Sequence, residues 1–198
     1  MLYIIFISLL KIPLWLLMRP KICGHKENLR MKGGVIFVCN HRALMDPVKL
    51  AIICPRIIHF MAKKELFDTK LGSIFFKSLF VFPVSRKTAD IKSVKNAIKL
   101  LEKGKAFGIY PEGKRAVTDN IDDIEKGTAF IAAKSGAPIV PIYLKEAKHR
   151  LSRVEVMVGE VITVESASAV RPDMKPVEAV TEAIRSSLEE LGLEVRKK

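Results

Sequence analysis

Cysteine, aromatic residues and acidic residues are all scarce in this 198-residue chain. The three cysteines, Cys23, Cys39 and Cys54, are odd in number, lie in or beside apolar runs and form no CxxC pair. This argues against a disulfide framework or a zinc site and is typical of reduced cytosolic cysteines. Aromatic residues make up only 7%, and no zinc-finger spacing or helix-turn-helix pattern is found. Because few rings are present to stack on bases, we expect no nucleic-acid partner.

The shortage of acidic residues gives the chain a large positive charge. Lys and Arg total 34 against 21 Asp and Glu, so the formal net charge is +13. Such a charge predicts attraction to a polyanion: nucleic acid, an anionic membrane surface or an acidic carrier protein. With 49% hydrophobic and 28% charged residues, the rest of the composition is that of one globular domain.

The N-terminal segment favours the membrane among these partners. Residues 1–18 are apolar except for Tyr3, Ser8 and Lys11. A helix of this length is about 27 Å long, marginal for a hydrocarbon core of roughly 30 Å. Lys11 near the bilayer centre would cost about 2.5 to 3.5 kcal/mol. We therefore expect a membrane-associating helix over residues 1–20 that lies in or dips into one leaflet.

The flanks of this segment set the expected location of the remaining chain. A signal peptide would carry basic residues ahead of the apolar run and small residues at a cleavage site, and neither is present. Arg19 and Lys21 follow the segment instead. Basic residues stay on the cytoplasmic side, so we expect residues 21–198 to form one domain at the cytoplasmic face of the cell membrane.

Apolar runs and amphipathic segments alternate along residues 21–198. This alternation predicts a single α/β domain with a largely parallel central sheet flanked by helices. Residues 154–158 and 161–164 are predicted to pair as a hairpin across Gly159-Glu160. The other predicted strands cover 35–39, 57–61, 80–86, 106–110 and 137–144, and the predicted helices cover 46–55, 90–103, 125–134 and 177–191.

Residues 63–79 are predicted to form helical pieces broken at Gly72. Phe75, Phe76, Leu79 and Phe80 make a bulky apolar cluster there, which we expect to belong to the core. The alternative is that this cluster dips into lipid or lines a groove for an acyl chain.

A histidine stands directly after the first predicted strand. The run Val35–Cys39 is β-branched and apolar, as in a strand buried on both faces, and His41 then lies at its carboxyl end, where open α/β sheets bind ligands. Asp46 follows five residues later, and with Pro47 it predicts a helix start with Asp46 as the N-cap. A neutral imidazole there can take a proton from a hydroxyl, with the carboxylate fixing its tautomer. The alternatives are a plain helix cap and a hydrogen-bonded polar residue at a strand end.

A second loop at a strand end resembles a nucleotide-binding loop. Residues 108–114 match GxxxxGK, but Pro111 removes a backbone donor, Glu112 adds a negative charge and Arg115 replaces the hydroxyl that holds magnesium. Nucleotide binding is therefore not expected. Arg86 ends one predicted strand and Arg115 follows another, so the two can instead clamp one phosphate.

Four segments together resemble the glycerolipid acyltransferases, most closely the bacterial 1-acyl-sn-glycerol-3-phosphate acyltransferases. Their order along the chain is that of the family. Residues 40–46 (NHRALMD) are similar to the NHxxxxD block, 82–86 (FPVSR) to the second block, 110–115 (YPEGKR) to the FPEGTR block, and 140–142 (VPI) to the fourth. Ala43, Ser85 and Lys114 depart from the family's usual Ser, Asp and Thr.

The resemblance implies an O-acyltransferase that makes phosphatidic acid in phospholipid biosynthesis. His41 would be the general base and Asp46 its orienting partner, so that the 2-hydroxyl of lysophosphatidic acid attacks the thioester of acyl-CoA or acyl-carrier protein. No metal or cofactor is implied beyond this acyl donor. The implied substrate-binding residues are Asn40, Arg86, Glu112, Gly113, Lys114, Arg115 and Pro141. The alternatives are an acyltransferase for another lysolipid or glycerol phosphate acceptor, and a non-catalytic basic protein on membrane or nucleic acid.

Overall fold

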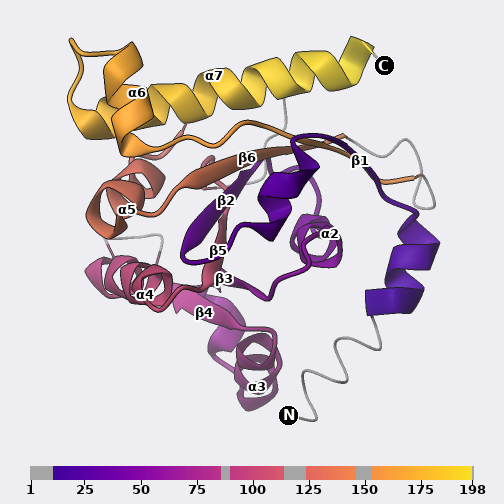
Figure 1. Cartoon of the computed structure of the whole chain (residues 1–198). Helices are drawn as coiled ribbons and strands as arrows, with labels where there is room; N and C mark the ends of the chain where they lie inside the picture. Colours follow the sequence, from indigo (N-terminus) through magenta and orange to yellow (C-terminus); the bar gives the residue numbers. More distant parts are fainter. Residues whose placement is uncertain (1–10, 86–89, 114–123, 146–152, 198) are drawn as a thin grey trace.

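A seven-stranded sheet runs through the part of the chain that the computed structural model describes, residues 11–85, 90–113, 124–145 and 153–197. Its strand order is β1-β7-β6-β2-β5-β3-β4 (Figure 1). Strands β2 to β6 are parallel to one another, whereas β7 is antiparallel to β6 and β1 runs with β7. The predicted single α/β domain with a largely parallel sheet is confirmed. The strands are β1 (Lys21–Gly24), β2 (Val35–Cys39), β3 (Ile58–Lys63), β4 (Val81–Val84), β5 (Ala106–Ile109), β6 (Ile139–Leu144) and β7 (Glu155–Val158).

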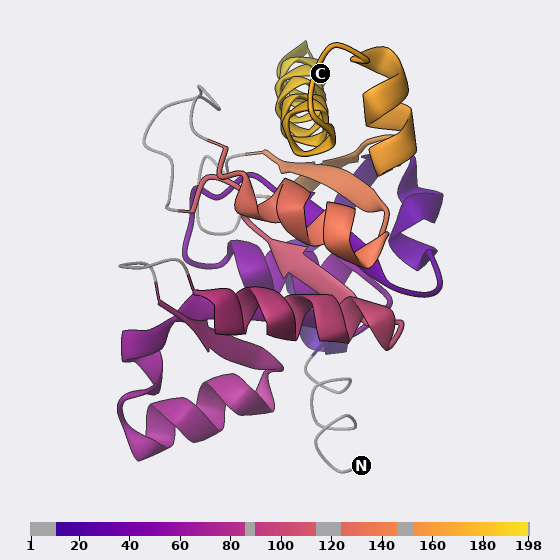
Figure 2. The ribbon, with the colours of Figure 1, turned by 90° about the vertical axis from the view of Figure 1, so that its left-hand side faces the viewer.

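Helices cover both faces of the sheet (Figures 1 and 2). Four of them pack on one face: α4 (Ile91–Glu102), α5 (Gly127–Ser135), α6 (Val164–Val170) and α7 (Pro176–Lys197). The other face carries η1 (Lys26–Arg30), α2 (Asp46–Ile53) and a helix over residues 11–18. Helix α3 (Lys70–Ser78) and η2 (Lys64–Phe67) connect β3 to β4 at the end of the sheet. Cover on both sides explains why β2 is apolar and buried at all five positions.

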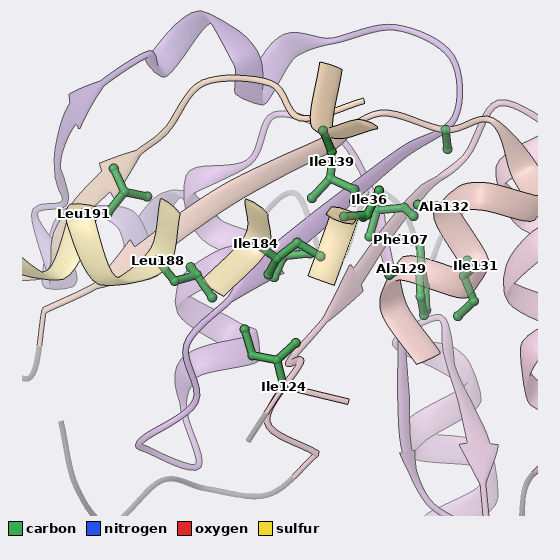
Figure 3. Packing of buried hydrophobic residues seen from close by; sticks show 14 of the residues in the cluster. Ile36, Phe107, Ile124, Ala129, Ile131, Ala132, Ile139, Ile184, Leu188 and Leu191 are labelled. Atoms are coloured by element: carbon green, nitrogen blue, oxygen red, sulfur yellow. The ribbon is translucent and has the colours of Figure 1, made fainter. Parts of the chain in front are cut away.

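The core between the sheet and α7 fixes the strand that carries His41. Ile36, Phe107 and Ile139 come from three neighbouring strands and belong to one buried cluster with Ile184 and Leu188 of α7 (Figure 3). All five side chains are fully buried. Burying a side chain of this size contributes about 1.5 to 3 kcal/mol, so the carboxyl end of β2 is held on a rigid support.

One end of the sheet differs from the sequence prediction. β1 is a strand that the sequence pattern did not predict, and β7 pairs with β1 and β6 rather than with residues 161–164. The predicted hairpin is therefore wrong. The reason is a capping box: Thr163 and Ser166 exchange hydrogen bonds between side chain and backbone, which starts α6 directly after a single bridge from Ile162 to Ile139.

The predicted helix break at Gly72 is also wrong. Helix α3 starts after its N-cap Thr69 and runs through Gly72, whose N–H donates to Thr69 Oγ1 over 3.0 Å. A Cβ at position 72 would lie 2.5 Å from the Leu66 carbonyl oxygen. Glycine therefore permits the close approach of α3 to η2 rather than ending the helix.

The bulky apolar cluster was expected to belong to the core, and this prediction is wrong. No residue of α3 is buried, and Phe75 and Leu79 are exposed. The helix lies past the edge strand β4, so the sheet and η2 cover only one of its sides (Figures 1 and 2).

Of the segment predicted to form an N-terminal helix, residues 11–18 are helical and residues 1–10 lie outside the described ranges. The Lys11 ammonium donates to the Cys54 carbonyl at the end of α2, and Met18 packs on the core. None of the described helices combines the length and the apolar character needed to cross a bilayer. Membrane binding by residues 1–20 stays a prediction.

Candidate active site

The end of β2 is clamped to the end of β6 just before His41. The buried Asn40 side chain donates to the Leu144 carbonyl over 3.0 Å and accepts from the Leu144 N–H over 2.7 Å. Asn40 is predicted to bind substrate. In the structure, its amide oxygen and its amide nitrogen both bind Leu144 and so hold the ends of β2 and β6 together. These two hydrogen bonds fix the point at which the chain leaves the sheet, and therefore the position of His41, the next residue.

His41 and Asp46 form the predicted pair. His41 Nδ1 lies 3.2 Å from Asp46 Oδ2, and the same oxygen accepts the Arg42 and Ala43 N–H groups over 2.8 and 2.6 Å. A carboxylate at Nδ1 requires the proton on that nitrogen, which leaves the Nε2 lone pair available. The imidazole keeps 17% exposure whereas the Asp46 side chain is buried, so the imidazole is the member of the pair that solvent reaches.

Hydrogen bonds hold Asp46 ionised. Burial alone would raise the pKa of its carboxyl, but the bonds from His41, Ala43, Lys49 and Arg42 outweigh it and lower the pKa from 3.8 to about 2. The negative charge is therefore fixed at Nδ1 and can stabilise an imidazolium.

The predicted capping role of Asp46 is wrong. Asp46 is the first residue of α2, the N-cap position is occupied by Met45, and no side chain caps the helix. The carboxylate turns back to the loop N–H groups instead, because the tight turn from Ala43 O to Asp46 N brings them within reach.

Lys49 is a third member of the site that sequence reasoning missed. Its ammonium donates to Asp46 Oδ1 over 2.9 Å, and the lysine side chain is only 12% exposed. Each carboxylate oxygen thus has its own partners, which fixes the carboxylate plane. The sequence signal for this contact is the i,i+3 spacing of Asp46 and Lys49 on α2, because residues at this spacing are neighbours on a helix face.

The end of β5 supplies the wall beside His41. The Tyr110 ring stacks on the imidazole with centroids 4.3 Å apart, and Glu112 Oε1 accepts the His41 N–H over 3.4 Å. Burial raises the pKa of the Glu112 carboxyl, and its buried Oε2 has no hydrogen-bond partner among the described residues. Gly113 has φ +64°, a conformation that favours glycine, and a Cβ there would lie 2.2 Å from Glu125 Oε1, so a larger residue would displace the Glu125 carboxylate.

The remaining predicted site residues lie elsewhere or cannot be placed. Pro141 is inside β6, in register with Val38 and three residues before the strand ends at Leu144. Arg86, Lys114 and Arg115 lie outside the described residues.

Metal ligands do not gather in the described ranges: no three His, Cys, Asp or Glu side chains come together there. That the reaction uses no metal or cofactor stays a prediction.

Comparison with known proteins shows which family this chain belongs to. The sequence model of the Acyltransferase family matches residues 21–145, a segment that includes His41, Asp46 and Glu112. The chain belongs to this family. It is 33% identical over 173 residues to the 1-acyl-sn-glycerol-3-phosphate acyltransferase of Bacillus subtilis, a match that covers 84% of this chain and 85% of that protein. A relative of the same name from Borreliella burgdorferi is 33% identical over 147 residues, which are 72% of this chain and 58% of the relative.

A solved structure shares the fold. The crystal structure of the 1-acyl-sn-glycerophosphate (LPA) acyltransferase PlsC from Thermotoga maritima matches with a TM-score of 0.70 and 21% identity, over 90% of this chain and 73% of that one. The resemblance to the glycerolipid acyltransferases is confirmed, and the chain is an acyltransferase. Family membership also sets aside the non-catalytic alternative.

Proposed function

We propose that this acyltransferase transfers a fatty acyl group from acyl-CoA or acyl-carrier protein to the 2-hydroxyl of 1-acyl-sn-glycerol-3-phosphate, giving phosphatidic acid. The observation that carries the proposal is the His41–Asp46 pair at the carboxyl edge of the sheet, with Nδ1 held by a buried carboxylate. The activity in the name of the Bacillus relative, which aligns over most of both chains, supports the acceptor.

The reaction moves one proton from the acceptor hydroxyl to His41 and then from His41 to the departing thiolate. His41 Nε2 takes the proton of the 2-hydroxyl as the oxygen attacks the thioester carbonyl, and the Asp46 carboxylate stabilises the imidazolium. The tetrahedral intermediate then collapses, the C–S bond breaks, and the departing thiolate takes the proton from the imidazolium. A general base of this kind supplies about 10²- to 10⁴-fold, and the rest comes from holding both substrates in place.

Direct transfer without an acyl-enzyme fits the residues around His41. Burial raises the pKa of the Cys39 thiol well above its usual range, so this cysteine stays protonated inside β2. Within the described part of the chain, no hydroxyl or thiol group is hydrogen-bonded to His41. The substrate hydroxyl is therefore the nucleophile.

The backbone N–H groups beside His41 are not free to bind an oxyanion. Those of His41, Arg42 and Ala43 already donate to Glu112 and Asp46. The loop after β2 thus uses its backbone to orient carboxylates, and the charge that develops on the thioester oxygen must be stabilised by other donors.

The phosphate of the acceptor is assigned to the loops after β4 and β5. Arg86 and Arg115, with Gly113 and Lys114, would bind it, as the family resemblance implies. Ser85, the residue before Arg86, donates its N–H to Asp90 Oδ2 over 2.8 Å, which holds the end of β4 against the start of α4. Glu112 Oε2, buried and without a described partner, can accept a hydrogen bond from a hydroxyl of the glycerol.

A location at the cytoplasmic face of the membrane belongs to the same proposal. In the helix over residues 11–18, Ile12, Trp15, Leu16 and Leu17 are exposed apolar side chains. Such a surface suits an acceptor that resides in a bilayer.

An acceptor and donor panel with the purified protein in vesicles tests the proposal. We expect acyl transfer to 1-acyl-sn-glycerol-3-phosphate, and at least about tenfold less to lysolipids without a phosphomonoester, since losing a charged pair of bonds costs more than 1.4 kcal/mol. Parallel reactions with acyl-CoA and acyl-carrier protein identify the donor. Equal acylation of acceptors without a phosphomonoester would replace the proposed acceptor by another lysolipid.

Lys49 should support this reaction by holding the carboxylate of Asp46 in place. Lys49→Met removes the donor to Asp46 Oδ1, so the carboxylate plane is no longer fixed from that side and Asp46 orients His41 less well. We expect kcat/KM to fall by about tenfold, which corresponds to the loss of one hydrogen bond of about 1.4 kcal/mol. Lys49→Arg keeps a charged donor and should retain most of the activity. Wild-type kcat/KM in Lys49→Met would restrict Lys49 to a structural role.

A further inference from the structure

Helix α3 carries an apolar stripe that the fold leaves uncovered. Leu71, Ile74 and Phe75 are 82%, 66% and 58% exposed, and their i, i+3, i+4 spacing places them on one side of the helix. Leu66 in η2 and Leu79 after the helix are exposed as well. The opposite side of α3 is the one that packs on η2 and β4. An apolar stripe of this kind on a soluble surface marks an interaction site.

Lysines border the stripe. Lys70 and Lys77 are exposed and stand seven positions apart, so both lie on the same flank of α3. Lys63 and Lys64 are exposed just ahead of it, against two acidic residues, Glu65 and Asp68. An apolar stripe with a basic flank is the pattern of a helix that lies in the interface of an anionic bilayer.

The stripe is close to the edge of the sheet where His41 lies. η2 starts at the carboxyl end of β3, and β3 runs parallel to β2, so Leu66 and the start of α3 are at the carboxyl edge. At the same edge, Leu44 is exposed in the loop between His41 and Asp46. Figures 1 and 2 both place α3 at the end of the molecule opposite α7.

We propose that α3, with Leu66, is a second lipid-binding element that seats the carboxyl edge of the sheet on an anionic phospholipid bilayer. The inference deepens the proposed function, on which it rests for the lipid acceptor, and adds a contact separate from residues 1–20. A bilayer fits the stripe better than a protein partner, because the apolar residues project from a single helix, lysines flank it, and the whole chain carries +13.

Vesicle binding of the 198-residue chain tests whether α3 contacts an anionic bilayer. The probe is co-sedimentation with vesicles of phosphatidylcholine and phosphatidylglycerol. The variant Leu71→Ser/Ile74→Ser/Phe75→Ser should bind at least about tenfold more weakly, because three apolar side chains no longer enter the interface. The matched control is Ile91→Ser/Val170→Ser/Leu193→Ser, three side chains with 65%, 76% and 55% exposure on α4, α6 and α7. Binding of the control should equal that of the wild type.

Removing the lysine charges beside the stripe provides a second, independent test. Lys70→Gln/Lys77→Gln should weaken binding to phosphatidylglycerol vesicles by about fivefold for each lysine, and leave binding to pure phosphatidylcholine unchanged. A third variant, Ile12→Ser/Leu16→Ser/Leu17→Ser, measures the N-terminal helix separately, so failure of one contact is distinguishable from failure of the other.

Two results would overturn the assignment. One is vesicle binding of the α3 serine variant equal to that of the wild type. The other is a wild-type dimer in vesicle-free buffer that the α3 variant converts to a monomer, which would make a second copy the occupant. Acyl transfer to a dispersed short-chain acceptor should be unchanged in the α3 variant. If the wild type showed no acyl transfer to this acceptor, the proposed acceptor chemistry would be rejected, whereas the vesicle-binding result would still hold.

Discussion

His41→Ala is expected to reduce acyl transfer by about 10²- to 10⁴-fold while the fold stays intact. The substitution removes the nitrogen that the described part of the chain offers as a base to the acceptor hydroxyl, and general-base catalysis contributes a factor of about this size. The side chain sits in a loop beyond the last buried residue of β2, so its loss opens no cavity in the core. Turnover with labelled acyl donor, together with a thermal unfolding curve, measures both parts.

A second histidine provides the control. His59 lies in β3, where its Nδ1 is 3.2 Å from the Ala106 carbonyl oxygen, and burial lowers its pKa. His59→Gln keeps a hydrogen-bonding group there and should retain wild-type turnover. If His41→Ala turned over at the wild-type rate, the base would have to be sought elsewhere in the family fold.

Sequence reasoning succeeded where a short segment determines its own surroundings. β2 was predictable because five consecutive apolar residues between glycines and polar residues suit only a strand covered on both faces. The position of His41 followed from it, since a residue after such a strand must lie at the carboxyl edge. α4 and α7 were likewise predictable from helical spacing of their apolar residues.

The errors concern elements whose fate depends on distant partners. β1 is four residues long and is a strand only because β7 lies beside it. The aromatic residues of α3 were assigned to the core because sequence shows how apolar a helix is, whereas its place beyond the edge strand β4 decides whether anything covers it. Both depend on the order of strands in the sheet, which local patterns do not contain.

Within the candidate site, the sequence identified residues better than roles. His41 and Asp46 were named together, but the capping role given to Asp46 was wrong, because its carboxylate serves the loop and Lys49. Asn40 is next to His41 in the sequence, but its side chain forms hydrogen bonds with the backbone of Leu144, which is 104 residues away. Contacts of that range become visible only once β2 and β6 are known to be neighbours.

Asp46→Asn should impair both catalysis and stability, for two different physical reasons. An amide N–H2 facing His41 Nδ1 would place the imidazole proton on Nε2, the nitrogen that must act as the base, so turnover should fall by roughly 10²- to 10⁴-fold. Exposed Asp173→Asn is the matched control and should behave as the wild type.

The stability effect of Asp46→Asn follows from the pKa of about 2 that the folded chain gives this carboxyl, against its ordinary 3.8. The unfolded chain binds the proton more tightly, so the ionised carboxylate stabilises the fold by about 2 kcal/mol above pH 4, and this contribution is lost as the pH falls from about 4 to 2. Urea unfolding should therefore show a less stable variant at pH 7, where the amide also leaves Lys49 without its charged partner. The difference between variant and wild type should shrink as the pH falls through that window. A difference that stays constant from pH 7 to pH 2 would mean that the Asp46 charge contributes nothing to stability and that only packing was lost.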